Sequence, residues 1–144
     1  MSRTITITIS VDVDELISSY PSGGTITDHN VISMSSDSGE DTWENGYLDK
    51  LITLIDESDV LIWKIVPLSG SYRLSLSAFI GDTNKDTLLQ STPVPVSGTQ
   101  NTQWTCQVKS TLPKDIGCSY CFKFTSNYGR DLYWQWDPFI KSRR

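Results

Sequence analysis

Hydrophobic and polar residues alternate with a period of two at the start of the chain. Residues Thr4 to Val13 read T-I-T-I-T-I-S-V-D-V, so every second side chain from Ile5 onward is aliphatic. Successive side chains of a strand point to opposite faces of its sheet, which places these aliphatic side chains together. The segment therefore predicts a half-buried β-strand whose Thr and Ser side chains face solvent.

A short helical turn is expected directly after this strand. Residues Asp14 to Tyr20 follow an aspartate that suits a helix N-cap, and Pro21 and the glycines after it end the helix. A short strand from Val31 to Met34 comes next. The polar and acidic stretch from Ser35 to Gly46, in which Trp43 is the only large apolar side chain, is interpreted as a long loop.

Short apolar runs bounded by turn residues continue along the rest of the chain. The run from Leu48 to Ile55 fits both a helical stripe and a buried strand, and we interpret it as a strand. Further strands are predicted at Val60–Val66, Tyr72–Ile80, Gln103–Ser110, Ser119–Ser126 and Leu132–Trp136. In the second of these, the side chains expected to point inward are Leu74, Leu76, Ala78 and Ile80.

The spacing of these strands indicates the fold class. The segment Thr92–Val96 carries Pro93 and Pro95, which lack an amide donor, so it suits a sheet edge or an extended linker. About seven or eight short strands separated by regularly spaced turns are typical of an antiparallel β-sandwich, immunoglobulin-like or jelly-roll-like. Because 144 residues can bury one such core, we predict a single all-β domain over residues 1–144, with one short helical turn after the first strand.

The charge balance is acidic, with 12 Lys and Arg residues, 17 Asp and Glu residues and a formal net charge of -5. Nucleic acids and anionic membranes bind clustered basic side chains, and only Lys141, Arg143 and Arg144 cluster here. Neither a membrane span nor a signal peptide is readable, and three cysteines are too few for a disulfide framework. We expect a cytoplasmic protein with no nucleic-acid or membrane partner.

The motifs of common hydrolases and nucleotide-binding proteins do not occur in the sequence. His29 is the only histidine, and in the run Asp28-His29-Asn30 its catalytic use would require an acid or a nucleophile brought near it by the fold. The run from Asp82 to Asp86 resembles the start of a calcium loop but lacks that loop's later Gly and Glu, which favours an ordinary polar turn. We expect no enzymatic activity, no metal and no cofactor.

Two further motifs have simple structural explanations. Cys118 and Cys121 have the spacing of a redox pair, but residues three apart in a strand point to opposite faces. Trp134 and Trp136 share a strand face, where they form either a stacking platform for a sugar or part of the core, and we favour the core. The candidates for a binding site are Asp28, His29, Trp43 and Trp134.

Several stretches, spread over nearly the whole chain, resemble one known protein family. They include Val11-Asp12-Val13-Asp14, Asp28-His29, Asp59-Val60-Leu61-Ile62-Trp63 and Trp136-Asp137-Pro138-Phe139-Ile140. These pieces occur in the order found in the PixA/AidA inclusion-body protein family of bacteria, which the chain therefore resembles. Members of that family usually carry Gly-Asp before the Trp-containing strand, where this chain has Ser58-Asp59, and the difference concerns the type of turn.

The resemblance implies a small β-rich protein that accumulates as cytoplasmic inclusions in host-associated bacteria, under stationary-phase or quorum-sensing control and with a link to host interaction. It supplies no catalytic residue. Our leading hypothesis is a non-enzymatic protein that forms a homo-oligomer with copies of itself. The alternative is a lectin-like β-sandwich module that binds a carbohydrate or another host ligand, and an enzyme built on His29 is the third reading.

Overall fold

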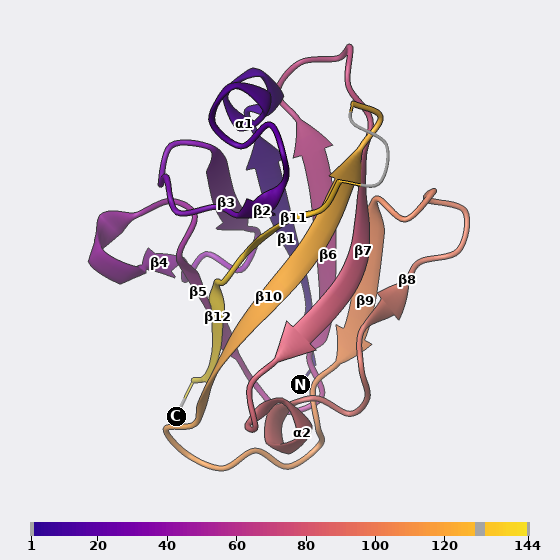
Figure 1. Ribbon diagram of the computed structural model, residues 1–144. Coiled ribbons are helices and arrows are strands. Elements are labelled where there is room, and N and C mark those ends of the chain that lie inside the picture. The colour runs from indigo at the N-terminus through magenta and orange to yellow at the C-terminus, as the bar shows by residue number, and fades with distance from the viewer. Residues whose placement is uncertain (1, 129–131, 144) are drawn as a thin grey trace.

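Two β-sheets pack against each other around one apolar core in the computed structural model, which describes residues 2–128 and 132–143 (Figure 1). The first sheet has the strand order β3-β1-β6-β9-β8. Its strands are β1 (Thr4–Val11), β3 (Ile32–Ser36), β6 (Val60–Pro67), β8 (Val94–Pro95) and β9 (Gln103–Gln107). The predicted alternation of β1 is confirmed, since its aliphatic side chains are all buried.

The second sheet has the order β2-β11-β10-β12-β5-β4, and β7 also pairs with β10. Its strands are β2 (Gly24–Thr25), β4 (Thr42–Trp43), β5 (Leu51–Ile55), β7 (Leu74–Gly81), β10 (Gly117–Ser126), β11 (Trp134–Trp136) and β12 (Phe139–Ser142). The long strand β10 runs through the centre of this sheet (Figure 1). The strand interpretation of the ambiguous Leu48–Ile55 segment is confirmed by β5.

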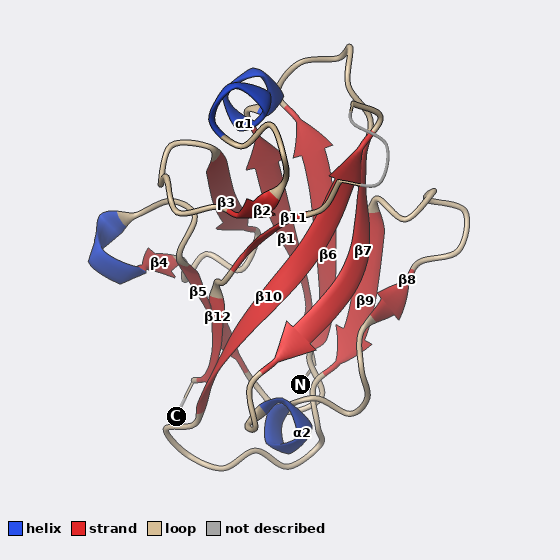
Figure 2. Ribbon diagram, viewed as in Figure 1, coloured by secondary structure: helices blue, strands red, loops and turns tan. Residues whose placement is uncertain are grey.

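The helices of residues 2–128 and 132–143 are short and lie at the ends and at one edge of the sheets (Figure 2). They are α1 (Val13–Ser19), α2 (Lys85–Leu88) and a single 3-10 turn, η1 (Glu44–Gly46). The predicted turn after the first strand is confirmed by α1, and the carboxylate of its N-cap Asp12 accepts a hydrogen bond from the Glu15 N–H at 3.2 Å. No helix within the described part of the chain has the length and apolar character that crossing a membrane requires.

The prediction of a simple antiparallel sandwich is wrong, because both sheets are mixed. In the first sheet β1 runs parallel to β6, with Ile7 beside Trp63. In the second, β12 runs parallel to β5 and β2 runs parallel to β11. Alternation in a sequence reports which face of a strand is buried and carries no information on the direction of its neighbours, so neither an immunoglobulin-like nor a jelly-roll-like order could be derived from it.

The predicted orientation of β7 is correct only in its first half. Leu74 and Leu76 are buried as expected. The pairing of β7 with β10 then shifts at Lys123/Phe124, opposite the residues around position 77. An irregularity of one residue exchanges the two faces of a strand, so Phe79 packs into the core while Ile80 is 50% exposed.

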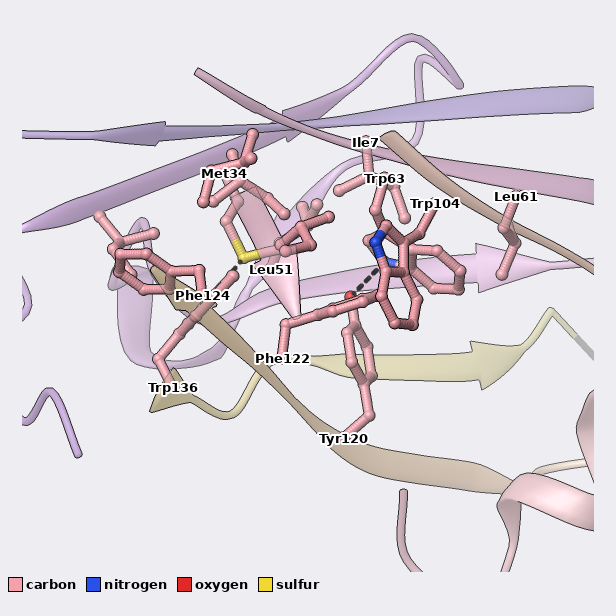
Figure 3. Close-up of a cluster of buried hydrophobic side chains, with 14 of the residues drawn as sticks. Ile7, Met34, Leu51, Leu61, Trp63, Trp104, Tyr120, Phe122, Phe124 and Trp136 are labelled. Atoms are coloured by element: carbon pink, nitrogen blue, oxygen red, sulfur yellow. Dashed lines mark hydrogen bonds between the residues drawn. The ribbon is translucent and has the colours of Figure 1, made fainter. Parts of the chain in front are cut away.

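Aromatic side chains fill the space between the sheets (Figure 3). The indole N–H of Trp63 donates to the Tyr120 hydroxyl at 3.0 Å, and that of Trp136 faces the Met34 sulfur at 3.3 Å. Trp134 is fully buried and donates to the Tyr20 carbonyl at 2.9 Å. The core interpretation of Trp134 and Trp136 is therefore confirmed.

Candidate functional site

A surface pocket of about 490 Å³ lies between the loop that precedes β3 and the segment that follows η1. It is lined by Thr27, Asp28, His29, Asn30, Gly46, Tyr47 and Leu48, and we call it the His29 pocket. Two of the residues singled out in the sequence, Asp28 and His29, therefore lie in one cavity.

The imidazole of His29 is held on two sides. Its Nδ1 atom lies 3.0 and 3.2 Å from the two carboxylate oxygens of Asp49, which is only 1% exposed. One face of the ring stacks on Tyr47, with 3.6 Å between ring centroids and 8° between planes. Because a carboxylate only accepts hydrogen bonds, Nδ1 carries a proton, and Nε2 is the ring nitrogen left for other partners.

The loop that carries His29 is anchored to the end of α1. The hydroxyl of Tyr20 accepts hydrogen bonds from the backbone N–H groups of Thr27 at 2.9 Å and Asp28 at 2.8 Å. Its contact with the Thr27 hydroxyl, followed by these backbone bonds, lowers the pKa of Tyr20 below its ordinary value. Asp28 in turn accepts from the Asn30 N–H at 2.9 Å, so the backbone of the loop is bonded at several points.

The other two residues predicted for a site have structural roles. Trp43 is half-buried on β4, where its indole N–H donates to the Met34 carbonyl at 3.0 Å. Trp134 exposes none of its side chain, so it does not border the His29 pocket. The sequence analysis missed Tyr47 and Asp49, because their contact with His29 depends on a tertiary approach between two loops that no local pattern reveals.

The chemistry available in the His29 pocket is hydrogen bonding and stacking. The hydroxyl of Thr27, the one aliphatic hydroxyl in the lining, lies 3.2 Å from the Tyr20 hydroxyl. Among the described residues it makes no hydrogen bond to the imidazole, as a nucleophile activated by His29 would. Within residues 2–128 and 132–143, no group of three His, Cys, Asp or Glu side chains could hold a metal ion. The pocket thus has the groups of a binding site, namely one imidazole, one surface carboxylate and one aromatic ring.

Comparison with protein families gives one match over most of the chain. The model of a domain of unknown function, DUF8788, matches residues 3–132. The chain belongs to this family. No curated protein matches it.

The fold is also found in a solved structure. A crystal structure of an inclusion body protein, PixA, from Burkholderia cenocepacia J2315 is similar with a TM-score of 0.69. The likeness covers 99% of this chain and 96% of that chain, at 11% sequence identity. At this identity it shows a shared fold, so the PixA-like fold expected from the sequence resemblance is present.

In this DUF8788 chain, the run from Asp82 to Asp86 resembles the start of a calcium loop, but the Asp82 carboxylate is bonded to backbone N–H groups of the chain itself. The carboxylate of Asp82 accepts hydrogen bonds from the Asn84 N–H at 2.8 Å and the Ser119 N–H at 3.0 Å. Burial acts to raise the pKa of Asp82, but these backbone bonds outweigh it and lower the pKa overall. The segment continues into α2, so the polar turn favoured by the sequence is confirmed and ends in one turn of helix.

The cysteines do not form a redox pair. All three are free, and Cys118 is buried whereas Cys121 is half-buried on the opposite face of β10. Desolvation raises the pKa of Cys118 to about 12 and also raises that of Cys121. A raised pKa keeps a thiol protonated and unreactive, the opposite of what a redox cysteine needs.

A smaller pocket of about 290 Å³ lies beside a network of ion pairs near the C-terminal strand. Arg143 lies 3.0 Å from Glu40 and 2.9 Å from Asp56, and Arg3 bonds both Glu40 at 2.8 Å and the buried Asp59 at 3.1 Å. The predicted basic cluster is therefore neutralised at Arg143, while Arg144 lies outside the described residues. Pairing of opposite charges accounts for these side chains without a ligand.

Proposed function

We propose that this chain is a non-enzymatic, self-associating protein of the inclusion-body type and a distant relative of the PixA/AidA family. The full-length correspondence of its fold with the inclusion body protein PixA carries the proposal. The His29 pocket supports its non-enzymatic part, because the Asp49–His29 pair has no nucleophile beside it among the residues that line the pocket.

The edges of the first sheet indicate what kind of contact joins the copies. At one edge, β8 carries Pro95 and follows Pro93, which lack the amide donor needed to add a strand. At the other edge, the Met34 N–H of β3 donates to the Leu48 carbonyl at 2.8 Å. Both edges are therefore closed to strand addition.

The second sheet is protected in other ways. Its end strands β2 and β4 have two residues each, too few to template a partner strand. Along the outer edge of β7, the Leu76 N–H donates to the Asn101 carbonyl at 2.9 Å, and Gly81 packs closely against Lys85 of α2. We infer that copies meet through side chains on faces and loops, where Leu68, Ile80 and Val94 expose apolar surface.

Charge controls how closely the copies approach. A net charge of -5 on a 16.2 kDa chain gives modest repulsion near neutral pH, and the sequence pI is about 4.7. Lowering the pH toward this value protonates carboxylates and removes the repulsion between copies. Association should therefore strengthen as the solution is acidified.

Light scattering coupled to size-exclusion chromatography tests the proposal. Near neutral pH, the measured mass should exceed 16.2 kDa and increase across a concentration series. Electron microscopy of the associated fraction should show particles of regular shape, which separates ordered assembly from precipitation. A mass of one chain at every concentration and pH, or irregular aggregates alone, would remove self-association as the function.

The cellular part of the proposal is accumulation in cytoplasmic inclusions of a host-associated bacterium, with synthesis in stationary phase or under quorum-sensing control. It rests on the sequence resemblance to the PixA/AidA family. A fluorescent fusion expressed from the native promoter should form foci as the culture leaves exponential growth. Uniform fluorescence at all growth stages would contradict it.

A further inference from the structure

We propose that the His29 pocket binds a neutral saccharide, which packs a ring face on Tyr47 and shares hydroxyl hydrogen bonds with Asp28 and His29. This binding activity goes beyond self-association and does not depend on it. Sugars combine an apolar ring face of C–H groups with hydroxyls that both donate and accept, and the pocket lining combines the matching groups.

The apolar part of the pocket is formed by Tyr47 and Leu48. Tyr47 is 43% exposed although the His29 ring stacks on one of its faces. Leu48, the next residue, also lines the pocket and is exposed. An exposed aromatic ring beside an exposed aliphatic side chain provides a surface for the C–H face of a sugar ring.

The polar part of the pocket consists of the Asp28 carboxylate, which accepts hydrogen bonds, and the His29 imidazole, which offers its Nε2 atom. One carboxylate oxygen of Asp28 accepts from the Asn30 N–H, and the other has no hydrogen bond to any residue that the structure describes. His29 uses Nδ1 for Asp49, and its Nε2 likewise has no partner in that part of the chain. A carboxylate oxygen and an imidazole nitrogen can bind two neighbouring hydroxyls, because a hydroxyl donates to one partner and accepts from another.

The charges around the pocket disfavour other small ligands. An anion would meet the Asp28 carboxylate in the pocket, with the buried Asp49 carboxylate bonded to the same imidazole, in a chain whose net charge is -5. A metal ion generally needs at least three protein ligands, and the described residues offer no such group here. A neutral polyol carries no charge to be repelled and uses the same donors and acceptors.

The pocket is organised before a ligand arrives. Tyr20 fixes the backbone of Thr27 and Asp28, while Asp49 and Tyr47 fix the His29 ring in two directions. Side chains that are already ordered lose little conformational entropy on binding. The pocket is nevertheless open, so we expect a dissociation constant on the order of 1 mM for a single hexose.

Saturation-transfer NMR tests the site, and it works equally on a monomer and on an assembly. The full chain is titrated with glucose, galactose, mannose and N-acetylglucosamine, and at least one should receive magnetisation mainly on the C–H protons of one ring face. Tyr47→Ala should weaken binding about tenfold or more, because the ring platform is lost. Tyr128→Ala is the matched control, since Tyr128 is also 43% exposed but does not line the pocket.

A second variant keeps the test decisive if Tyr47→Ala proves unstable. Asp28→Asn keeps an oxygen that accepts the Asn30 N–H but loses the charged acceptor, and it should weaken binding by about tenfold. Circular dichroism melts establish that each variant is folded before it is titrated. No transfer to any of the four sugars at about ten times the expected dissociation constant would overturn the proposal. Equal affinity in wild type, Tyr47→Ala and Asp28→Asn, or a loss in Tyr128→Ala alone, would overturn it as well.

Discussion

His29 donates a hydrogen bond to Asp49, a residue 20 positions later in the chain whose carboxylate is almost fully buried. The pair joins the loop before β3 to the segment before β5. His29 is the only side chain described as bonding this carboxylate, and 36% of the His29 side chain is itself exposed. The relationship is therefore asymmetric: the buried Asp49 carboxylate needs His29 as its hydrogen-bond partner, whereas the partly exposed His29 ring can also bond water.

We predict that His29→Ala destabilises the protein by about 2–3 kcal/mol, because it leaves a buried carboxylate without a partner. Adding Asp49→Asn in the same chain should recover part of this loss, since an amide is less costly to bury than a charge. Urea denaturation of the two single variants and the double variant measures the coupling. Strictly additive losses would show that the pair contributes nothing beyond its separate side chains.

The register of β1 predicts two unequal core substitutions. Ile7 is fully buried beside Trp63, so Ile7→Ala should lower the free energy of unfolding by about 2–5 kcal/mol. Thr6→Ala, one residue away on the half-buried outer face, should cost less than about 1 kcal/mol. Chemical denaturation of both variants checks this, and equal losses would reject the assigned faces.

Tyr120 provides the acceptor for the indole of Trp63 at the centre of the core. Tyr120→Phe keeps the ring but leaves the Trp63 N–H buried without an acceptor, which should cost about 1–3 kcal/mol. Tyr133→Phe is the control, because Tyr133 is exposed and its hydroxyl should contribute almost nothing. A melting temperature that falls equally in both variants would contradict the assigned bond.

The sequence predicts those elements of the fold whose structure is determined by residues close together in the chain. The strand β1 and the helix α1 were predictable, because strict alternation and an aspartate cap act within a few residues. The strand β12 was missed, since it has four residues and directly follows Asp137-Pro138, which indicates the end of a strand. The change of face in β7 arises from its pairing with β10, so no alternation within β7 could indicate it.

Only part of the candidate site could be predicted from the sequence, for the same reason. Asp28 and His29 are neighbours in the sequence and attract notice as an acid beside the only histidine. Tyr47 and Asp49 complete the pocket from a segment that reads as an ordinary loop. Their role appears only when the two loops meet, because stacking and pairing depend on distances that sequence spacing does not contain.

The turn between β5 and β6 contains a residue in a conformation that favours glycine. Ser58 has a φ of 64°, in the left-handed region, at the position where the sequence pattern of the PixA/AidA family usually has Gly. Ser58→Gly removes a steric cost of about 1 kcal/mol, partly offset by the greater freedom of glycine in the unfolded chain, so stability should rise by up to about 1 kcal/mol. Ser58→Ala keeps the Cβ atom and should bring no gain. Denaturant titration compares the stabilities of Ser58→Gly and Ser58→Ala. If Ser58→Gly is less stable than the wild type, Ser58 carries no steric cost in this turn.

Burial of Cys118 makes the folded protein sensitive to alkali. Its pKa rises from 9.0 to about 12 in the folded chain, chiefly through desolvation. Between these values the unfolded chain releases the thiol proton while the folded chain keeps it, so the folded state binds more protons and its stability falls as pH increases. Below pH 9.0 the thiol is protonated in both states and this loss does not occur.

We therefore predict that the free energy of unfolding declines from about pH 9 to about pH 12, at up to about 1.4 kcal/mol per pH unit from this one group. Cys118→Ala should reduce the slope, whatever its effect on absolute stability, because the residue no longer titrates. The slope should not vanish, since burial also raises the pKa of Tyr120 and of Cys106. Denaturant melts at a series of alkaline pH values measure it. An unchanged slope in Cys118→Ala would show that the Cys118 thiol does not determine the alkaline limit of this fold.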